Sequence, residues 1–394
     1  MEVYDIIHGN INIDPLAKKI IDTNEFQRLR NIKQLGCCNF VFPSAVHTRF
    51  EHSIGVYHLA NKFIDILNKK LTDEGRDPCF SNEEKRCITI AGLIHDIGHG
   101  PYSHLFDELF DEDKNHEYRS GELFKRMNQN YGLGFNETQL QNIINYIYPK
   151  NILIESKDKY KYQIISNKNG IDVDRFDYIM RDIKMTGLNY GIEYERIMNN
   201  ACIKDNEIVF SEKVKTSIEE FYRIRYIMYK EVYNHRTVRA IEYMMKDFIK
   251  LYSQKYKVDK IIQRDDWDSY IKLNDNMIDF NEIADPLFGL VVDENIELKK
   301  IINNIITRNI YKSIGEIIKD SPIDFDDYNK ENIIIDTVKI SYYGREKCKY
   351  FKERRINNTI DGWKDKDSYI TGVYYKTEDY KEEALRIYNL LLNI

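Results

Sequence analysis

The chain lacks several features that would assign it to a particular class of protein. No stretch approaches the roughly 20 apolar residues that a membrane-spanning helix needs. The N-terminus, residues 1–5, has neither a basic start nor an apolar run, so we expect no secretory signal. The six cysteines do not have zinc-finger spacing, and the adjacent Cys37 and Cys38 make a poor disulfide framework. A reduced intracellular compartment, cytoplasmic or nuclear, is the simplest interpretation.

An excess of positive charge is also missing. The 58 basic residues are outnumbered by 64 acidic residues, which gives a net charge of −6. This balance argues against nucleic acid as the main partner, although a local basic pocket remains compatible with it. The sequence has no internal repeat, low-complexity tract or glycine–serine linker, and its 394 residues can bury a large core.

What the chain does have is a concentration of histidine. Seven of the nine histidines lie between residues 47 and 116, and one of them forms the doublet His95–Asp96. This doublet offers an imidazole nitrogen and a carboxylate oxygen from adjacent positions, a combination suited to a hydrolytic divalent metal. Histidines that only pack or solvate the surface would be scattered, so the clustering indicates a metal site.

The spacing of apolar residues predicts that residues 15 to about 250 are mostly helical. A helix at 50–67 would carry His52 on its inward, apolar face. A second helix at 86–95 would deliver His95 and Asp96 to its end, where glycines and a proline break it. A third, rich in acidic residues, would start after Gly170, and one long helix is predicted from about 216 to 252.

The pattern of apolar residues changes beyond about residue 256, from one typical of helices to one that includes strands. Segments 332–344 and 368–375 are predicted as strands, and 380–392 as a closing helix. We therefore expect a mainly α fold, with a helical domain in residues 1–255 and a smaller α+β lobe in residues 256–394.

A buried divalent metal needs about four protein ligands and open positions for water and substrate. The natural candidates are three residues of the histidine-rich window and one later carboxylate: His52, His95, Asp96 and Asp174. Asp174 is the best placed of the later carboxylates because it opens the third helix. Asp172 and Asp177 remain competing assignments for the fourth ligand.

At these residues the chain resembles the HD-domain metal-dependent phosphohydrolases. Within them it is most similar to the deoxynucleoside triphosphate (dNTP) triphosphohydrolases, and among these to the eukaryotic enzymes that join a sterile-alpha-motif domain to an HD domain. The resemblance is carried by segments 5–9 (DIIHG), 20–30 (IIDTNEFQRLR), 32–36 (IKQLG), 41–43 (VFP), 49–53 (RFEHS), 95–101 (HDIGHGP) and 169–174 (NGIDVD). It is strong from residue 3 to about 250 and weaker beyond. Because it begins almost at residue 1, we expect no sterile-alpha-motif domain.

The resemblance implies hydrolysis of a dNTP at the α-phosphorus, which releases the deoxynucleoside and intact triphosphate. It implies one divalent transition metal per chain, bound by His52, His95, Asp96 and Asp174. Mixed nitrogen and oxygen donors favour iron, manganese, zinc or nickel. Magnesium is a candidate companion of the nucleotide phosphates.

The resemblance also implies roles for the residues around the metal. The acid–base group would comprise His99, His104, Asp107, His116 and Glu117, with His104 placed to protonate the leaving 5′ oxygen. The phosphates would be held by Arg49, Arg175, Tyr178 and Arg225, with His99 and His104 beside them. The 3′-hydroxyl would be held by Gln34 and Asp182. Leu35 and Tyr233 would crowd the 2′ position, so a ribonucleotide would fit poorly. His8, His47 and His58 are expected to be structural.

In the resembled enzymes a guanine nucleotide and a dNTP bridge subunits. The resemblance therefore implies GTP or dGTP and a dNTP as candidate activators, a homo-oligomer between dimer and tetramer, and a regulatory role for the C-terminal lobe. The matching positions are Asp22, Gln27 and Arg30 for guanine, and Val41, Phe42, Arg196, His235 and Arg236 for the second nucleotide. Three positions depart from the family pattern. Arg175 replaces a lysine, Asn234 replaces a glutamine near the base, and Tyr4 replaces an asparagine near the regulatory pocket.

Two other functions remain open at this point. A phosphodiesterase or nuclease of the HD type, acting on another nucleotide, would use the same metal but needs fewer cations, so Arg49, Tyr178 and Arg225 together favour the triphosphate. A non-catalytic nucleotide sensor could lose the metal ligands freely, and here the full set of ligands and histidines is present.

Overall fold

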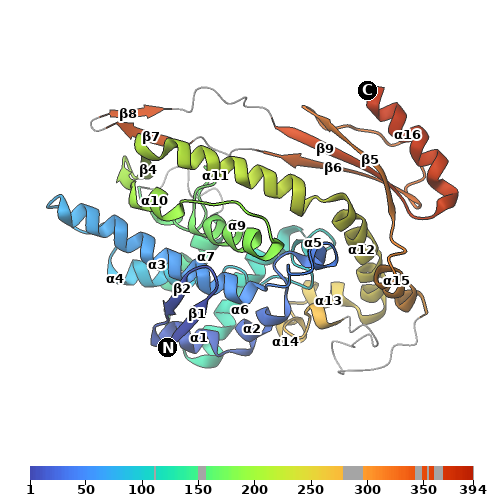
Figure 1. The fold of residues 1–394 in the computed structure, drawn as a ribbon. Coiled ribbons are helices and arrows are strands. Elements are labelled where there is room, and N and C mark those ends of the chain that lie inside the picture. Colours follow the sequence, from blue (N-terminus) through green and yellow to red (C-terminus); the bar gives the residue numbers. More distant parts are fainter. Residues whose placement is uncertain are drawn as a thin grey trace.

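The computed structural model describes residues 1–110, 112–149, 157–277, 296–341, 348–352, 355–358 and 367–393. Its helices are α1 (Pro15–Ile21), α2 (Asn24–Gln27), α3 (Arg49–Asp73), α4 (Asn82–Ile94), α5 (His104–Asp107), α6 (His116–Tyr131), α7 (Glu137–Ile147), α8 (Lys159–Tyr162), α9 (Val173–Thr186), α10 (Tyr194–Asn199), α11 (Lys215–Met228), α12 (Arg236–Tyr256), α13 (Val258–Gln263), α14 (Trp267–Tyr270), α15 (Ile296–Ile306) and α16 (Lys381–Asn393). Its strands are β1 (Glu2–Asp5), β2 (Gly9–Asn12), β3 (Ala201–Lys204), β4 (Glu207–Ser211), β5 (Lys312–Lys319), β6 (Ile333–Ile340), β7 (Lys349–Lys352), β8 (Arg355–Asn358) and β9 (Ser368–Tyr375). The fold is mainly helical with a smaller α+β C-terminal part, as the sequence predicted (Figure 1).

Helices α3 and α4 form the centre of the main core, and both were predicted. The Thr48 side chain and Glu51 close a capping box at the start of α3, and Ser81 with Glu84 does the same for α4. The two helices pack against each other along their length. Because α4 ends at Ile94, His95 and Asp96 lie directly after its last turn, as predicted.

The third predicted helix is α9, which packs across α3. The Asp172 side chain caps its first turn by accepting from the backbone N–H of Arg175. Gly187, with φ of +76°, ends it in the left-handed conformation that favours glycine. The start of α3, the end of α4 and the start of α9 therefore meet in one region.

The prediction of one long helix from about 216 to 252 is wrong. Helix α11 ends at Met228 and continues into a π-helical turn, Tyr229–Tyr233, after which the chain breaks before α12. His235 has extended backbone angles (φ −58°, ψ 125°), and its Nδ1 accepts from the N–H of Thr237. The carbonyl of Tyr229 accepts from the Asn234 side chain at 2.8 Å as well as from the backbone N–H of Asn234 at 3.0 Å, which closes the π-helical turn. Local capping by these two side chains overrides the apolar periodicity.

The mostly helical region also contains a hairpin that was not predicted. Strands β3 and β4 pair antiparallel, and β7 from the C-terminal part adds to β4 in parallel, which gives the sheet order β3-β4-β7-β8. Figure 1 shows this sheet at the opposite end of α11 from the second, C-terminal sheet. The C-terminal segment therefore returns to the helical region.

The second sheet has the order β5-β9-β6 and carries α16 on one face. Strands β6 and β9 and helix α16 confirm the predictions for 332–344, 368–375 and 380–392, although residues 342–344 lie outside the described residues. Strand β5 was missed. The sheet and α16 enclose a small core of their own, around Val373 and Ile387, whereas α15 joins the main core by packing against α12. The predicted domain boundary after residue 255 falls at the end of α12 and stays a prediction.

Among the described residues, no helix combines the length and the apolar character that a membrane span requires.

Candidate active site

Four side chains from three helices converge on one point. His52 lies in the first turn of α3, His95 and Asp96 follow α4, and Asp174 lies in the first turn of α9. Nε2 of His52 is 3.2 Å from Nε2 of His95 and 3.1 Å from Oδ1 of Asp174. Oxygens of Asp96 lie 3.5 Å from Nε2 of His52 and 3.4 Å from Nε2 of His95. The structure thus brings the four predicted metal ligands together.

These residues fit a divalent metal. Nδ1 of His52 donates to Oδ2 of Asp177 at 2.8 Å, and Nδ1 of His95 donates to the carbonyl of Gly92 at 2.8 Å. Each Nε2 is then left with a lone pair, and two lone pairs that face each other at 3.2 Å repel unless a cation lies between them. Metal–ligand bonds of about 2.0–2.1 Å at tetrahedral angles place neighbouring donor atoms about 3.4 Å apart, close to the distances in this cluster.

The carboxylates of the cluster are ionised at neutral pH. Burial alone would raise the pKa of Asp96, but the guanidinium of Arg49, 2.6 Å away, holds that pKa well below its usual range. Burial likewise opposes ionisation of Asp174, and its contacts with His52 and His95 outweigh burial, so the pKa of Asp174 also lies below its usual range. An ionised carboxylate is the form that binds a cation.

The structure separates Asp174 from the two competing assignments. Asp172 is occupied at the start of α9, where it caps the helix and forms an ion pair with Arg175. Asp177 lies on the far side of His52, where it bonds Nδ1 rather than the Nε2 that faces the cluster. It is held there by Arg181 at 2.9 Å and by His8 at 2.7 Å. Asp177 therefore orients a metal ligand instead of being one.

A glycine on α3 makes room for this arrangement. A Cβ atom at Gly55 would lie 1.9 Å from Oδ1 of Asp177 and 2.7 Å from Nη2 of Arg181. Any side chain there would displace the carboxylate that orients His52. The site therefore requires glycine at position 55 of α3.

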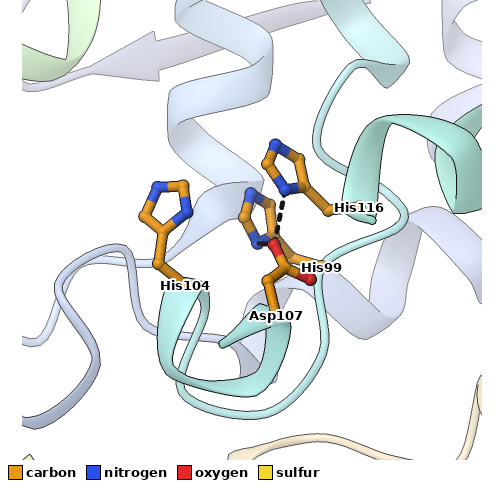
Figure 2. Close-up of side chains that lie close together, drawn as sticks. All are labelled: His99, His104, Asp107 and His116. Carbon is orange, nitrogen blue, oxygen red and sulfur yellow. Dashed lines mark hydrogen bonds and ion pairs between the residues drawn. The ribbon is translucent and has the colours of Figure 1, made fainter. Parts of the chain in front are cut away.

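A second group of side chains comes from the loop after α4, from α5 and from the start of α6: His99, His104, Asp107 and His116 (Figure 2). Nδ1 of His116 donates to Oδ2 of Asp107 at 2.5 Å, and Arg119 pairs with the other oxygen of Asp107. The rings of His99 and His116 stack 3.8 Å apart with 16° between their planes, and His104 stands nearly perpendicular to His99. Because imidazole lone pairs lie in the ring plane, two stacked rings direct them along parallel planes rather than to one ion. The group is suited to proton transfer rather than to a second metal.

His104 projects into the cavity between these two groups. Its surroundings lower its pKa to about 4, through desolvation first and the charges of Arg49 and His116 second. Burial raises the pKa of Glu117, which is beside His116. Negative charge bound next to Arg49 would offset the guanidinium and raise the pKa of His104 again.

Two adjoining cavities enclose the predicted site. The smaller, of about 190 Å³, is lined by the four predicted metal ligands together with Arg49, Arg175 and Tyr178. The larger, of about 320 Å³, shares Gln34, Arg49, His104 and Tyr178 with it. Of the predicted catalytic and substrate-binding residues, only Asp107 and Arg225 are absent from the cavity walls. Asp107 lies behind His116, and Arg225 lies 5.0 Å from the ring centre of Tyr229, with its Nη1 donating to the carbonyl of Ser341.

The larger cavity holds the residues predicted for the sugar. Asp182 is 1% exposed and is fixed from two sides, by Nε2 of His47 at 2.8 Å and by the hydroxyl of Tyr233 at 2.6 Å. Gln34 and Leu35 line the same cavity. Its wall includes Tyr102 and Ser103, both with φ of +60°, a strained conformation that the hydrogen bond from Arg49 Nε to the Ser103 hydroxyl helps to hold.

The residues predicted for regulation are only partly brought together within one chain. Arg30 donates to Gln27 at 2.8 Å, and Asp22 is an exposed residue that ends α1 and pairs with Lys18. Phe42 contacts His235, with ring centres 5.8 Å apart. Val41 is half-buried beside Phe42, and Arg236 is exposed at the start of α12. Arg196 contacts Glu193 and the carbonyl of Lys213 instead.

Sequence reasoning missed the supporting residues His8, His47, Ser103, Arg119 and Arg181. Their contacts join positions far apart in the chain, such as His8 with Asp177 and His47 with Asp182. The available signal was chemical: a buried carboxylate needs a partner, and the histidines assigned to structural roles were the spare donors. His8 and His47 each hold a carboxylate of the site in place.

Comparison with known proteins finds two family models that match the chain. A model of the HD domain matches residues 49–182, and a model described as the HD associated region matches residues 192–328. The chain is 40% identical over 339 residues to a putative HD domain-containing protein of Acanthamoeba polyphaga mimivirus, an alignment that covers 79% of this chain and 72% of that protein.

Two further relatives have names that state an activity. The chain is 35% identical over 324 residues to the deoxynucleoside triphosphate triphosphohydrolase SAMHD1 homolog of Dictyostelium discoideum. It is 34% identical over 358 residues to the deoxynucleoside triphosphate triphosphohydrolase SAMHD1 of Homo sapiens. Each alignment covers 80% of this chain, but 60% and 55% of these relatives, so the chain spans little more than half of their length.

Proposed function

The chain belongs to the HD-domain family, and from that premise we propose that it is a metal-dependent dNTP triphosphohydrolase. It would cleave a dNTP at the α-phosphorus into the deoxynucleoside and inorganic triphosphate. The observation that carries the proposal is the union of a four-ligand cluster with Arg49, Arg175 and Tyr178 in one cavity, next to a larger cavity of about 320 Å³ that can take a nucleoside. The printed names of the SAMHD1 relatives support the same activity.

His52, His95, Asp96 and Asp174 would hold one divalent metal. Two imidazole nitrogens and two carboxylates favour iron, manganese, zinc or nickel over calcium, and magnesium would accompany the phosphates of the nucleotide. When bound, the metal would polarise the α-phosphoryl group and lower the pKa of the attacking water.

The chain's own residues would bind and orient the substrate. Arg49, Arg175 and Arg225 would neutralise the triphosphate, a task for which guanidinium groups are suited by their paired donors, and the Tyr178 hydroxyl would donate a hydrogen bond to it. His104 would give a proton to the 5′ oxygen as its bond to phosphorus breaks, and His116 with Asp107 would supply that proton from behind. Asp182, held by His47, and Gln34 would bind the 3′-hydroxyl. Leu35 and Tyr233 would leave no room for a 2′-hydroxyl.

The product mixture tests this proposal. Metal-loaded protein is incubated with each dNTP and each ribonucleoside triphosphate, and the products are separated by ion-exchange chromatography. We expect deoxynucleoside and triphosphate in equal amounts, with ribonucleotides turned over at least about fivefold more slowly, since crowding a pocket by one hydroxyl costs on the order of 1–3 kcal/mol. Orthophosphate or diphosphate as the phosphate product would contradict the proposal, and cleavage of a phosphodiester in its place would favour the nuclease alternative.

We further propose that guanine nucleotide regulates the assembly of this protein through Asp22, Gln27 and Arg30, with a dNTP bound near Val41, Phe42, Arg196, His235 and Arg236. A nucleotide that binds only between subunits stabilises the oligomer by mass action. GTP or dGTP should therefore raise both the activity and the mass measured by light scattering, and Asp22→Ala should abolish both responses while keeping its metal.

A matched control exists for this variant. Asp326 pairs with Lys330 four residues away, just as Asp22 pairs with Lys18, and lies in the C-terminal part. Asp326→Ala should keep the full response. A native protein whose mass and activity do not change with GTP would contradict the regulatory proposal and leave the hydrolase proposal intact.

A further inference from the structure

The larger cavity extends beyond the residues assigned to the sugar. Its wall also includes Glu108 after α5, Arg239 and Glu242 of α12, and Val338 of β6. Three of these four side chains are charged. This end of the cavity is formed where α12 meets the C-terminal sheet, and no role has been assigned to it so far.

Glu242 is the carboxylate best fixed at this end. It lies one helical turn after Arg239, which donates to its Oε2 at 2.7 Å. Arg239 is itself anchored by Oδ2 of Asp336 on β6, with Nη2 at 2.8 Å and Nε at 3.2 Å. Among the described residues, Oε1 of Glu242 accepts no hydrogen bond. The ion pair therefore holds Glu242 in place and leaves Oε1, together with the second lone pair of Oε2, available to a ligand.

The cavity end is rich in hydrogen-bond acceptors. The donors of Arg239 are directed at Asp336 and Glu242, and Glu108 is paired with Lys246. Burial first, and then the negative charge of Glu108, raise the pKa of Glu242, which means that its ionised form is poorly solvated where it lies. A ligand that brings N–H donors to this point would replace the missing water.

We propose that Glu242 reads the Watson–Crick edge of the substrate base and favours guanine, an inference that rests on the proposed dNTP hydrolysis. Guanine offers two adjacent donors, N1–H and the exocyclic amino group, which match the two oxygens of one carboxylate. Adenine and cytosine offer one amino group beside an acceptor nitrogen. Thymine offers a single N–H between two carbonyl oxygens, and these would face the carboxylate unfavourably. The expected order is dGTP first and dTTP last.

The expected size of the preference for dGTP over dTTP can be taken from bidentate contacts between protein side chains and bases in other complexes. A good bidentate contact to a base discriminates by about 1–3 kcal/mol, or roughly 5- to 150-fold. The ratio of kcat/KM for dGTP to kcat/KM for dTTP should fall in this range for the native protein. Glu242→Gln replaces one acceptor by a donor of the same shape, so it should bring the ratio close to one, mainly by slowing dGTP.

The test measures kcat/KM for the four dNTPs with the native protein, Glu242→Gln and the control Glu220→Gln. Glu220 forms the same kind of i,i+3 pair, with Arg223, but on the exposed surface of α11. A fixed concentration of GTP in every assay separates substrate preference from activation. Glu220→Gln should keep the native ratio.

The outcomes separate the two proposals. Equal kcat/KM for dGTP and dTTP in the native protein would overturn the role of Glu242 while dNTP hydrolysis stands, and this result needs no variant to fold. A native preference that survives Glu242→Gln would also overturn it. No turnover of any dNTP would overturn the proposed function, and this inference with it.

Discussion

Replacing His95 or Asp174 by alanine should remove the metal and abolish turnover. Each of these residues supplies one of about four donor atoms, and Nε2 of His52, Nε2 of His95 and Oδ1 of Asp174 lie within 3.5 Å of one another, so either change leaves an incomplete site. The loss should exceed about 10³-fold in kcat, because a catalytic metal contributes several kcal/mol of charge stabilisation. Elemental analysis should find close to one metal per native chain and almost none in the variants.

The helical fold should survive both changes. His95 and Asp174 lie at the end of α4 and the start of α9, and neither contributes an apolar side chain to the core, so the circular dichroism spectrum should be unchanged. Asp172→Asn is the matched control, because asparagine also caps helices and Asp172 points away from the cluster. It should keep its metal. Full activity in His95→Ala or Asp174→Ala would show that the metal site has been placed wrongly.

The second large effect is expected for His104→Gln, which should lower kcat by about 10²- to 10⁴-fold. Glutamine can still hydrogen-bond the substrate but cannot deliver a proton. The pKa of His104 is about 4 in the free protein, and the bound triphosphate should raise it by offsetting Arg49. As an acid, His104 must be protonated, so kcat should fall as pH rises through its pKa in the complex, and this alkaline limb should disappear in the variant.

His58→Gln is the control for this experiment. Burial also lowers the pKa of His58 to about 4, but His58 lies on α3 beside His8 and Lys62, outside both cavities of the site. This variant should keep the native kcat and the native pH profile. If His104→Gln keeps the alkaline limb, another group is the acid, and His116 becomes the next candidate.

The metal site could be predicted closely because its ligands lie at places that sequence patterns mark. A histidine on an apolar helix face, a His–Asp doublet at a helix end and an aspartate after a glycine each have a local signature. The choice among Asp172, Asp174 and Asp177 could not be made in this way. All three lie within two turns of one helix, and what separates them is contact with His52 on another helix.

The rest of the site depends on contacts between distant segments. His8 reaches Asp177 from the N-terminal hairpin, and Asp336 of β6 anchors Arg239 of α12. No periodicity records such pairs. The break at Asn234 and His235 was missed for a different reason: both residues are compatible with a helix, and only their side-chain caps reveal that the helix stops. Because of that break, Tyr233 reaches Asp182 while Glu242 faces the end of the cavity.

The most direct test of the account locates the bond that is cleaved. Metal-loaded protein hydrolyses dGTP in water enriched in oxygen-18, and both products are analysed by mass spectrometry. Attack at the α-phosphorus with His104 as the acid should place one labelled oxygen in the triphosphate and none in the deoxyguanosine. Label in the 5′-hydroxyl of the deoxyguanosine, or in an orthophosphate released in place of triphosphate, would contradict the central claim.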